Sequence, residues 1–430
     1  MEKKIDKIWI GIIHMGLGTI LAQMINVVTQ PILTRIFSVE ILGIYTYLIS
    51  IATIIIPVTT LKLDMLIVSE PNDCEAQYIT DTCIIINFII FILYITIILI
   101  GYILPGNNMF NRYGKIIFIV PFIVFTNGLR FLFISYLNRY QKYRIISIIA
   151  VIRETIRALI QVGTGLFSFG IFFLVLGYTC SPLFGLNIQM REYLEKLKKR
   201  PRININKFKK IIFEKGKKQI LFLVPGQFIN SLSSSIIIIS ITTLFSEKEL
   251  GYYSTGVMIL EIPIIFITSN VSKVCYQKFS ENVGNNKPIY KILTIVMIIL
   301  SVVSLLGFGI LWFIAPNFAG IIFGEGYEVA GTYIKYLCVM YAVRLVATSF
   351  SGICTLFKKQ EFELFINILL VIVAVLSYIV CNIFSYGILD YLKFINIGYT
   401  IVYMLLLLNY IVICRNYDKK IGDRNEFIQK

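Results

Sequence analysis

The sequence predicts an all-α integral membrane protein of about twelve transmembrane helices in two six-helix bundles, with both termini in the cytoplasm. Hydrophobic residues make up 57% of the 430 residues and charged residues 15%, whereas a soluble domain is about half apolar and a quarter charged. Apolar residues also form long runs, such as residues 83–104 and 291–314, and about 20 apolar residues cross a bilayer as a helix. Because lipid offers the backbone no hydrogen-bond partners, we expect the spans to be helices.

Hydrophilic breaks divide the chain into two sets of six expected spans. The longest hydrophilic segment separates the sets, so we expect an N-terminal bundle over 1–190, a basic cytoplasmic linker over 191–218, a C-terminal bundle over 219–414 and a cytoplasmic tail over 415–430. The expected spans lie near residues 8–34, 41–68, 78–104, 114–137, 143–167, 169–190, 219–244, 250–276, 289–314, 329–356, 361–384 and 391–414.

Lys and Arg are distributed unevenly over the connections between these spans. If the N-terminus is inside, 28 of the 40 Lys and Arg residues lie in inside segments and 5 in outside connections. Short loops rich in Lys and Arg stay in the cytoplasm. This asymmetry predicts two cytoplasmic termini, and it accounts for most of the net charge of +16 without a nucleic-acid partner.

A short polar joint occurs twice, as RIFSVEILGIYT (35–46) and TLFSEKELGYYS (243–254), with five identical residues at an offset of 208. Each joint falls after the first span of its set, so we expect two parallel repeats related by an axis along the membrane normal. Ser38 and Ser246 are expected to cap the helix that follows, with acidic residues near its positive end.

Charged side chains inside the expected spans are candidate functional residues, because a charge at mid-membrane costs at least ~2.5–3.5 kcal/mol on insertion scales. Cations outnumber anions among them, which favours an anionic cargo, and the planar fork of Arg suits phosphate. The alternative for each charge is snorkelling or a structural ion pair. The candidates for holding an anionic group are Lys62, Arg130, Arg153, Arg157, Lys335 and Arg344, with Arg35 at the first joint. The candidates for ion or proton coupling, or for ion pairs, are Asp64, Glu154 and Glu261, while Gln23, Asn26 and Gln30 share one face of the first span and are expected to line a polar cavity.

Common enzyme signatures are absent from the sequence. It contains no GxxxxGK[ST], CxxC, HExxH or GxSxG pattern and a single His, so we expect no cofactor and no metal centre. The longest expected outer connection, residues 315–329, is short and nearly free of charge. A lipid-linked sugar polymerase normally carries a substantial outer loop, so this class is disfavoured.

Residues 34–76, TRIFSVEILGIYTYLISIATIIIPVTTLKLDMLIVSEPNDCEA, resemble the start of the Wzx-type polysaccharide and O-antigen flippases of the multidrug/oligosaccharidyl-lipid/polysaccharide (MOP) exporter superfamily. That family shows an Arg ending span one, a Ser/Gly–x–Glu–x–x–Gly turn and an Arg-Tyr-Asp/Glu-like triplet ending span two. The corresponding features here are Arg35, the turn Ser38–Gly43 and the triplet KLD at 62–64, which departs from the pattern at its first two positions. The second half is similar to the family over 223–263.

The resemblance implies a MATE-like fold and a flippase of the bacterial cytoplasmic membrane. Such a flippase moves an undecaprenyl-pyrophosphate-linked oligosaccharide from the inner to the outer leaflet by alternating access, for surface polysaccharide biosynthesis. The implied partners are this lipid-linked cargo, membrane lipids, a counter-ion (H⁺ or Na⁺) and other membrane proteins of polysaccharide assembly. Two alternatives stay open: a cation-coupled multidrug exporter of the same superfamily, which the cationic excess disfavours, and the polymerase above.

Overall fold

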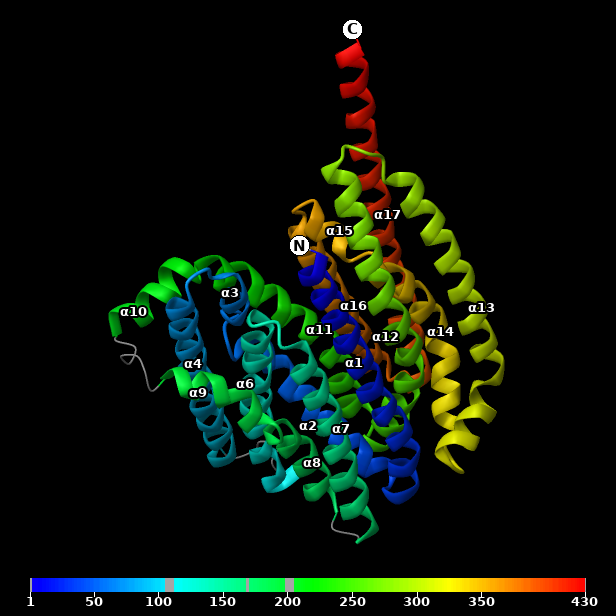
Figure 1. Ribbon diagram of the computed structural model, residues 1–430. Helices are drawn as coiled ribbons and strands as arrows, with labels where there is room; N and C mark the ends of the chain where they lie inside the picture. The colour runs from blue at the N-terminus through cyan, green and yellow to red at the C-terminus, as the bar shows by residue number, and fades with distance from the viewer. Residues whose placement is uncertain (1, 105–111, 168–169, 198–204, 430) are drawn as a thin grey trace. The chain divides into compact units, whose positions relative to one another are not determined.

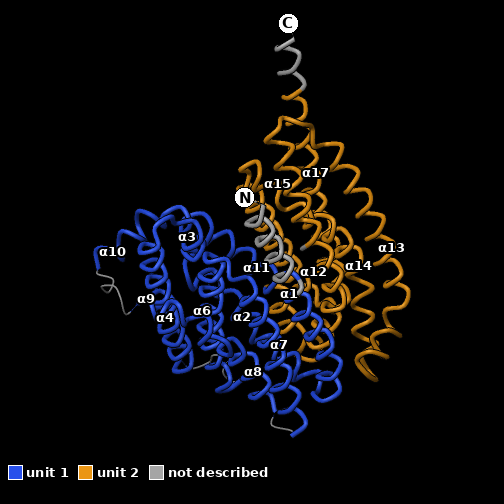
Figure 2. Tube along the Cα trace, viewed as in Figure 1, with its two compact units in different colours: residues 1–235 blue, residues 236–430 orange. Residues whose placement is uncertain are grey.

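The computed structural model describes residues 2–104, 112–167, 170–197 and 205–429, and every regular element in these ranges is helical (Figure 1). Ten helices in the described ranges are long and apolar enough to cross a membrane. The prediction of a helical membrane protein is therefore confirmed, while the count of twelve and the cytoplasmic termini stay predictions. The chain divides into two compact units, residues 1–235 and 236–430 (Figure 2).

Unit 1 is centred on α6, which packs against α2, α4, α7 and α8 and against the shorter helices α3 and α9. About two thirds of the residues in its most apolar stretch are buried, whereas a third or less are buried in the corresponding stretches of α2 and α4. Its Leu132, Phe133 and Tyr136 are fully buried in the core that it forms with α4. The elements are α1 (Glu2–Ile36), α2 (Val39–Ile55), η1 (Ile56–Val58), α3 (Asp64–Ser69), α4 (Asp73–Ile103), η2 (Gly114–Ile119), α6 (Val120–Arg139), α7 (Tyr143–Leu166), α8 (Ile171–Cys180), η3 (Ser181–Leu183), α9 (Leu186–Leu197), α10 (Ile205–Lys210), the π-helical turns η4 (Ile211–Lys215) and η5 (Gln219–Leu223), and α11 (Val224–Leu244) as far as residue 235.

Unit 2 is also arranged around one largely buried helix, which is α14. This helix packs against α12, α13 and α17, and about two thirds of the residues in its most apolar stretch are buried. Its small residues permit close packing, because a Cβ at Gly331 would lie 2.4 Å from the Ala315 carbonyl oxygen of α13. The elements are the end of α11, then α12 (Glu247–Gly284), α13 (Tyr290–Phe323), α14 (Glu328–Ser349), α15 (Gly352–Leu356), α16 (Gln360–Phe384) and α17 (Ile388–Gln429).

The two polar joints form equivalent helix starts. The Ser38 hydroxyl accepts a hydrogen bond from the backbone N–H of Ile41 at 3.4 Å and caps α2. The Ser246 hydroxyl accepts one from the backbone N–H of Glu249 at 3.2 Å and caps α12. Both capping predictions are confirmed, and the pairing of these starts agrees with a duplicated unit.

The second expected span is not one continuous helix. Its α-helix ends at Ile55, a 3-10 turn follows, and α3 begins only at Asp64. Pro57 removes a backbone donor at this point, and the Thr59 hydroxyl bonds the Ile56 carbonyl oxygen at 2.7 Å. The span expected near 41–68 is therefore interrupted, because local hydrogen bonds replace the helical ladder between residues 56 and 63.

Two other helices run further than the apolar pattern predicted. Helix α13 continues to Phe323, so most of the connection expected over 315–329 is helical. Helix α17 continues to Gln429 through the charged segment that follows residue 414. Its Asp418 carboxylate accepts the backbone N–H groups of Ile289 and Tyr290, each at 2.9 Å, and so caps α13.

Candidate functional site

Helix α7 carries two arginines and one glutamate as a connected, largely buried group. The Glu154 carboxylate accepts hydrogen bonds from Arg153 through Nε at 3.1 Å and Nη2 at 2.7 Å. Its other oxygen lies 2.8 Å from Nη2 of Arg157. The side chains of Arg153 and Arg157 are 16% exposed and that of Glu154 is 10% exposed. One carboxylate therefore serves both guanidinium groups.

Arg130 on α6 adds a third guanidinium to this group. It interacts electrostatically with Arg153, Arg157 and Glu154. Its guanidinium lies over the ring of Phe131, 4.2 Å from the centroid. Its Nε is buried and has no hydrogen-bond partner among the described residues. We call Arg130, Arg153, Glu154 and Arg157 the arginine cluster; three cations and one anion give the cluster a net charge of +2.

Polar and aromatic side chains of unit 1 surround the cluster. Arg157 donates a hydrogen bond to Asn26 Oδ1 of α1 at 2.6 Å and lies over the ring of Tyr178, 5.7 Å from its centroid. One turn further along α7, Gln161 donates to the Tyr45 hydroxyl at 3.0 Å. Of the polar face expected on α1, Asn26 thus contacts the cluster directly, while Gln23 and Gln30 are partly buried on the same helix.

Unit 2 holds a separate charged pair on facing helices. Arg344 of α14 donates a hydrogen bond to Glu261 of α12 at 2.8 Å, and the two side chains are 27% and 30% exposed. The guanidinium lies 5.1 Å from the ring centroid of Tyr341. Tyr253 and Tyr403 also interact electrostatically with this pair. Sequence spacing left Glu261 without a partner, and the fold supplies one 83 residues away.

The remaining predicted residues lie outside these two groups. Arg35 donates to the Pro31 carbonyl oxygen at 3.1 Å in the last turn of α1. Lys335 lies 5.3 Å from the ring centroid of Trp312. Lys62 lies in the break between α2 and α3, and Asp64 directly follows it. The structure thus joins only part of the predicted cationic set into one group.

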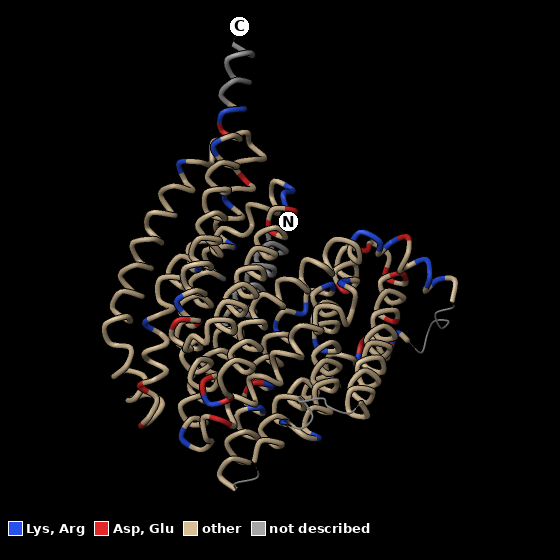
Figure 3. Tube along the Cα trace, turned by 180° about the vertical axis from the view of Figure 1, so that it is seen from behind, with Lys and Arg blue, Asp and Glu red and all other residues tan. Residues whose placement is uncertain are grey.

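Several neighbours of these groups were not predicted from the sequence. Gln161 could have been found, since it continues the four-residue spacing of Arg153 and Arg157 on one helix face. The tyrosines around both groups carry no distinguishing spacing. The described helices are mostly free of charge, with Lys, Arg, Asp and Glu at a few interior positions and at helix ends (Figure 3).

The fold is shared with several solved membrane transporters. The chain is similar to an inward-facing multidrug resistance MATE-family transporter of the MOP superfamily, with a TM-score of 0.65 at 13% identity over 95% of this chain and 99% of the other. It is similar to a MOP-superfamily transporter from Pyrococcus furiosus with a binding pocket of reverse polarity, with a TM-score of 0.64 at 13% identity over 95% and 96% of the two chains. It is also similar to the lipid II flippase MurJ in an inward closed conformation, with a TM-score of 0.65 at 13% identity over 96% and 90%.

These similarities establish the fold, which is that of the MATE and MurJ proteins. The sequence profile described as "Polysaccharide biosynthesis protein" matches residues 32–332. The chain therefore belongs to this family, as the resemblance of the first joint indicated. No curated protein matches the sequence.

Proposed function

We propose that the protein is a flippase of the bacterial cytoplasmic membrane, which moves an undecaprenyl-pyrophosphate-linked oligosaccharide from the inner to the outer leaflet by alternating access. Membership of the polysaccharide biosynthesis family and the transporter fold support this proposal. The solved structures of similar fold include a lipid II flippase. In this proposal the cargo serves a surface polysaccharide such as an O-antigen, and other membrane proteins of polysaccharide assembly act beside it.

The charge imbalance of the arginine cluster carries the proposal. Arg153 and Arg157 share the single carboxylate of Glu154. Arg130 interacts with Glu154 only electrostatically, and its buried Nε has no hydrogen-bond partner in the described ranges. Buried charges are normally paired, so an excess of guanidinium groups favours an anionic ligand. A pyrophosphate carries several negative charges and accepts the forked, bidentate hydrogen bonds that Arg donates. In this proposal the cluster holds the pyrophosphate while the oligosaccharide crosses.

The same imbalance weighs against a cation-coupled multidrug exporter. Cationic drugs are attracted by carboxylates, whereas three arginines repel them. The fold alone does not separate the two activities, because it is shared with a multidrug resistance transporter. Glu154, Asp64 and Glu261 are proposed as the groups that bind the counter-ion, H⁺ or Na⁺, since each is a carboxylate within a helix bundle.

Single substitutions of Arg130, Arg153 and Arg157 by Ala test the proposal in cells that depend on this protein. Arg144→Ala is the matched control, because Arg144 is exposed at the start of α7, the helix that carries Arg153 and Arg157. We expect the cluster variants to lower surface polysaccharide by about ten-fold or more, because a charge-assisted hydrogen bond is worth about 1.5–3 kcal/mol. Lipid-linked repeat units should then accumulate on the cytoplasmic face.

The outcomes separate the three classes of function. Unchanged surface polysaccharide in all three variants, with the protein still present in the membrane, would exclude the pyrophosphate site. Accumulation of single repeat units on the outer face would instead indicate a polymerase. Export of cationic drugs that survives in the arginine variants and fails in Glu154→Gln would indicate a multidrug exporter.

A further inference from the structure

The break between α2 and α3 has a strained backbone. Leu61 and Lys62 have φ of 48° and 57°, a left-handed conformation that non-glycine residues rarely adopt and that is especially unusual for a bulky side chain. Short turn bonds hold it, such as Leu63 N–H to the Thr60 carbonyl oxygen at 3.0 Å. Strain of this kind persists only where the surrounding structure imposes it and is frequent at switch segments.

The basic linker packs directly on this break. Gly216 lies between the two π-helical turns η4 and η5, and a Cβ on it would lie 2.3 Å from Cδ2 of Leu63, which is fully buried. Ile211, at the start of η4, is 2% exposed in the same apolar core. Single π-helical turns are rare and occur frequently at functional sites. The linker is therefore fitted to the break at a position that only glycine can occupy without displacement.

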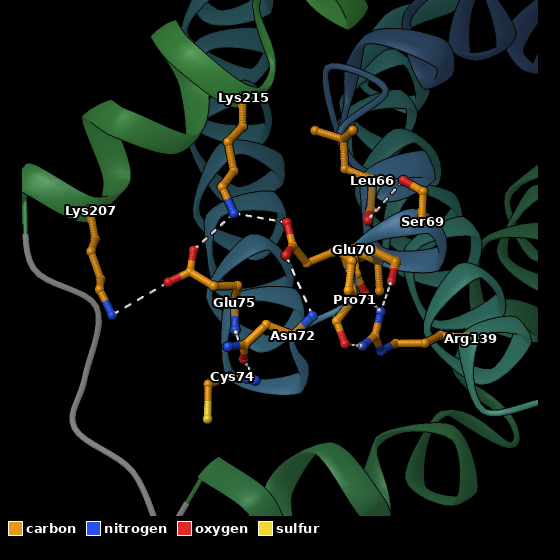
Figure 4. Close-up of polar contacts among 11 residues, drawn as sticks. Leu66, Ser69, Glu70, Pro71, Asn72, Cys74, Glu75, Arg139, Lys207 and Lys215 are labelled. Atoms are coloured by element: carbon orange, nitrogen blue, oxygen red, sulfur yellow. Dashed lines mark hydrogen bonds and ion pairs between the residues drawn. The ribbon is translucent and has the colours of Figure 1, made fainter.

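Lys215 ties the linker to both sides of the α3–α4 turn (Figure 4). Its ammonium lies 2.8 Å from Glu70, at the end of α3, and 3.1 Å from Glu75, in the first turn of α4. Lys207 of α10 lies 3.8 Å from Glu75 as well. One lysine of the linker thus bridges the helix before the turn and the helix after it.

Arg139 holds the same turn from α6. It donates to the Ile67 carbonyl oxygen at 2.8 Å, to the Glu70 carbonyl oxygen, and to the Asp73 carboxylate at 2.7 Å. Its side chain is 9% exposed. Helix α6 therefore fixes the far end of α3, while the linker contacts both the turn and the break.

Asp64 places a carboxylate at the start of α3, directly after the break. As the first residue of α3, it accepts hydrogen bonds from Thr60 at 2.6 Å and from Ser135 of α6 at 3.1 Å. The linker continues through η5 into α11, the helix in which unit 1 ends and unit 2 begins. A displacement of α11 would therefore act on Lys215 and Gly216, and through them on the break.

We infer that residues 59–63 are a hinge and that Lys215 and Gly216 are its latch, through which the linker sets the position of α3 and Asp64. The latch ties this hinge to the chain segment that joins the two units. This inference concerns a conformational device and does not depend on the identity of the cargo.

Hydrogen exchange of the full-length protein in lipid nanodiscs, without cargo, tests the latch. We expect Lys215→Ala to speed amide exchange over residues 59–69 by about five-fold, because a partly exposed ion-pair network adds a modest local stability. Lys217→Ala is the matched control, since Lys217 is exposed two residues along the same linker. The effect of the double variant Glu70→Ala/Lys215→Ala on exchange, expressed as a free energy, should be smaller than the sum of the two single effects, because both variants remove the same ion pair.

A second pair of variants tests the contact at Gly216. Gly216→Ala should speed exchange over the same residues, and Leu63→Val, which removes the atom that the new Cβ would strike, should restore part of the protection in Gly216→Ala. Equal exchange in Lys215→Ala and Lys217→Ala would overturn the latch. Exchange that changes in Arg130→Ala but not in the latch variants would also overturn it. Because no cargo is present, a failed flippase assay leaves this result unaffected.

Discussion

Replacing Arg130 with Leu should make the protein more stable and less active. A buried donor without a partner costs about 1–3 kcal/mol. Nε of Arg130 is buried and has no hydrogen-bond partner among the described residues. The guanidinium is also repelled by Arg153 and Arg157, although Glu154 attracts it. Its contact with the Phe131 ring returns about 0.5–2 kcal/mol. The balance favours leucine by about 1 kcal/mol.

The assay is the midpoint of thermal unfolding in detergent, at one heating rate because membrane proteins commonly unfold irreversibly. One kcal/mol moves the midpoint of a domain of 150–250 residues by about 2–4 °C, so we expect Arg130→Leu to raise it by about 2–4 °C. Surface polysaccharide should fall by about ten-fold in the same variant. Arg144→Leu, at the exposed start of α7, should change neither quantity.

A lower midpoint in Arg130→Leu would refute the reasoning, because it would show that the guanidinium is satisfied in the folded protein. Unchanged transport together with a higher midpoint would show that the imbalance is structural and that the anion site lies elsewhere. Arg130→Lys separates charge from geometry. It keeps the cation but lacks the planar fork of donors, so we expect partial activity.

Three further predictions concern unit 2 and the latch. Arg344→Met and Glu261→Gln should each lower the unfolding midpoint, and the double variant should be more stable than either, with a coupling of about 1–2 kcal/mol from a double-mutant cycle. Asp418→Ala should destabilise the protein by about 1–2 kcal/mol, since two N–H groups at the start of α13 lose their acceptor. The latch should be independent of pH between 6 and 8. The hydrogen bond from Lys215 holds the pKa of Glu70 below its ordinary value of 4.5, and although burial lowers the pKa of Lys215, its bonds to two carboxylates raise it above 10.5.

The pH prediction follows from the sign of each shift. The contribution of Glu70 is complete above about pH 4.5 and is lost as pH falls through its lowered pKa. The contribution of Lys215 is complete below about pH 10.5 and is lost as pH rises through its raised pKa. Exchange over residues 59–69 that changed between pH 6 and 8, after correction for the intrinsic rate, would contradict these assignments.

For Asp418, the Asn variant is the control because it keeps one acceptor oxygen, and an equal loss of stability in the Ala and Asn variants would contradict the capping role.

The sequence by itself determined the class of the protein and much of its plan. Apolar runs of about 20 residues define membrane helices without reference to any other part of the chain. The helix caps at Ser38 and Ser246 could also be predicted from the sequence, because a cap depends on a side chain and a backbone amide three residues apart. Arg153 and Arg157 both reach Glu154 on α7 in the structure, since the face of one helix follows from spacing alone.

The tertiary structure decided how the charges are shared and where the helices break. Arg344 meets Glu261 across 83 residues, and Arg139 meets the α3–α4 turn across 66 or more. Hydropathy and spacing act within one helix, so they cannot specify which distant carboxylate pairs with a given cation. The break at residues 59–63 is similar, because its Leu63 packs against Gly216, about 150 residues further along the chain. The pairing of buried groups is a property of the folded core, in which each charge must find a partner that the linear sequence does not identify.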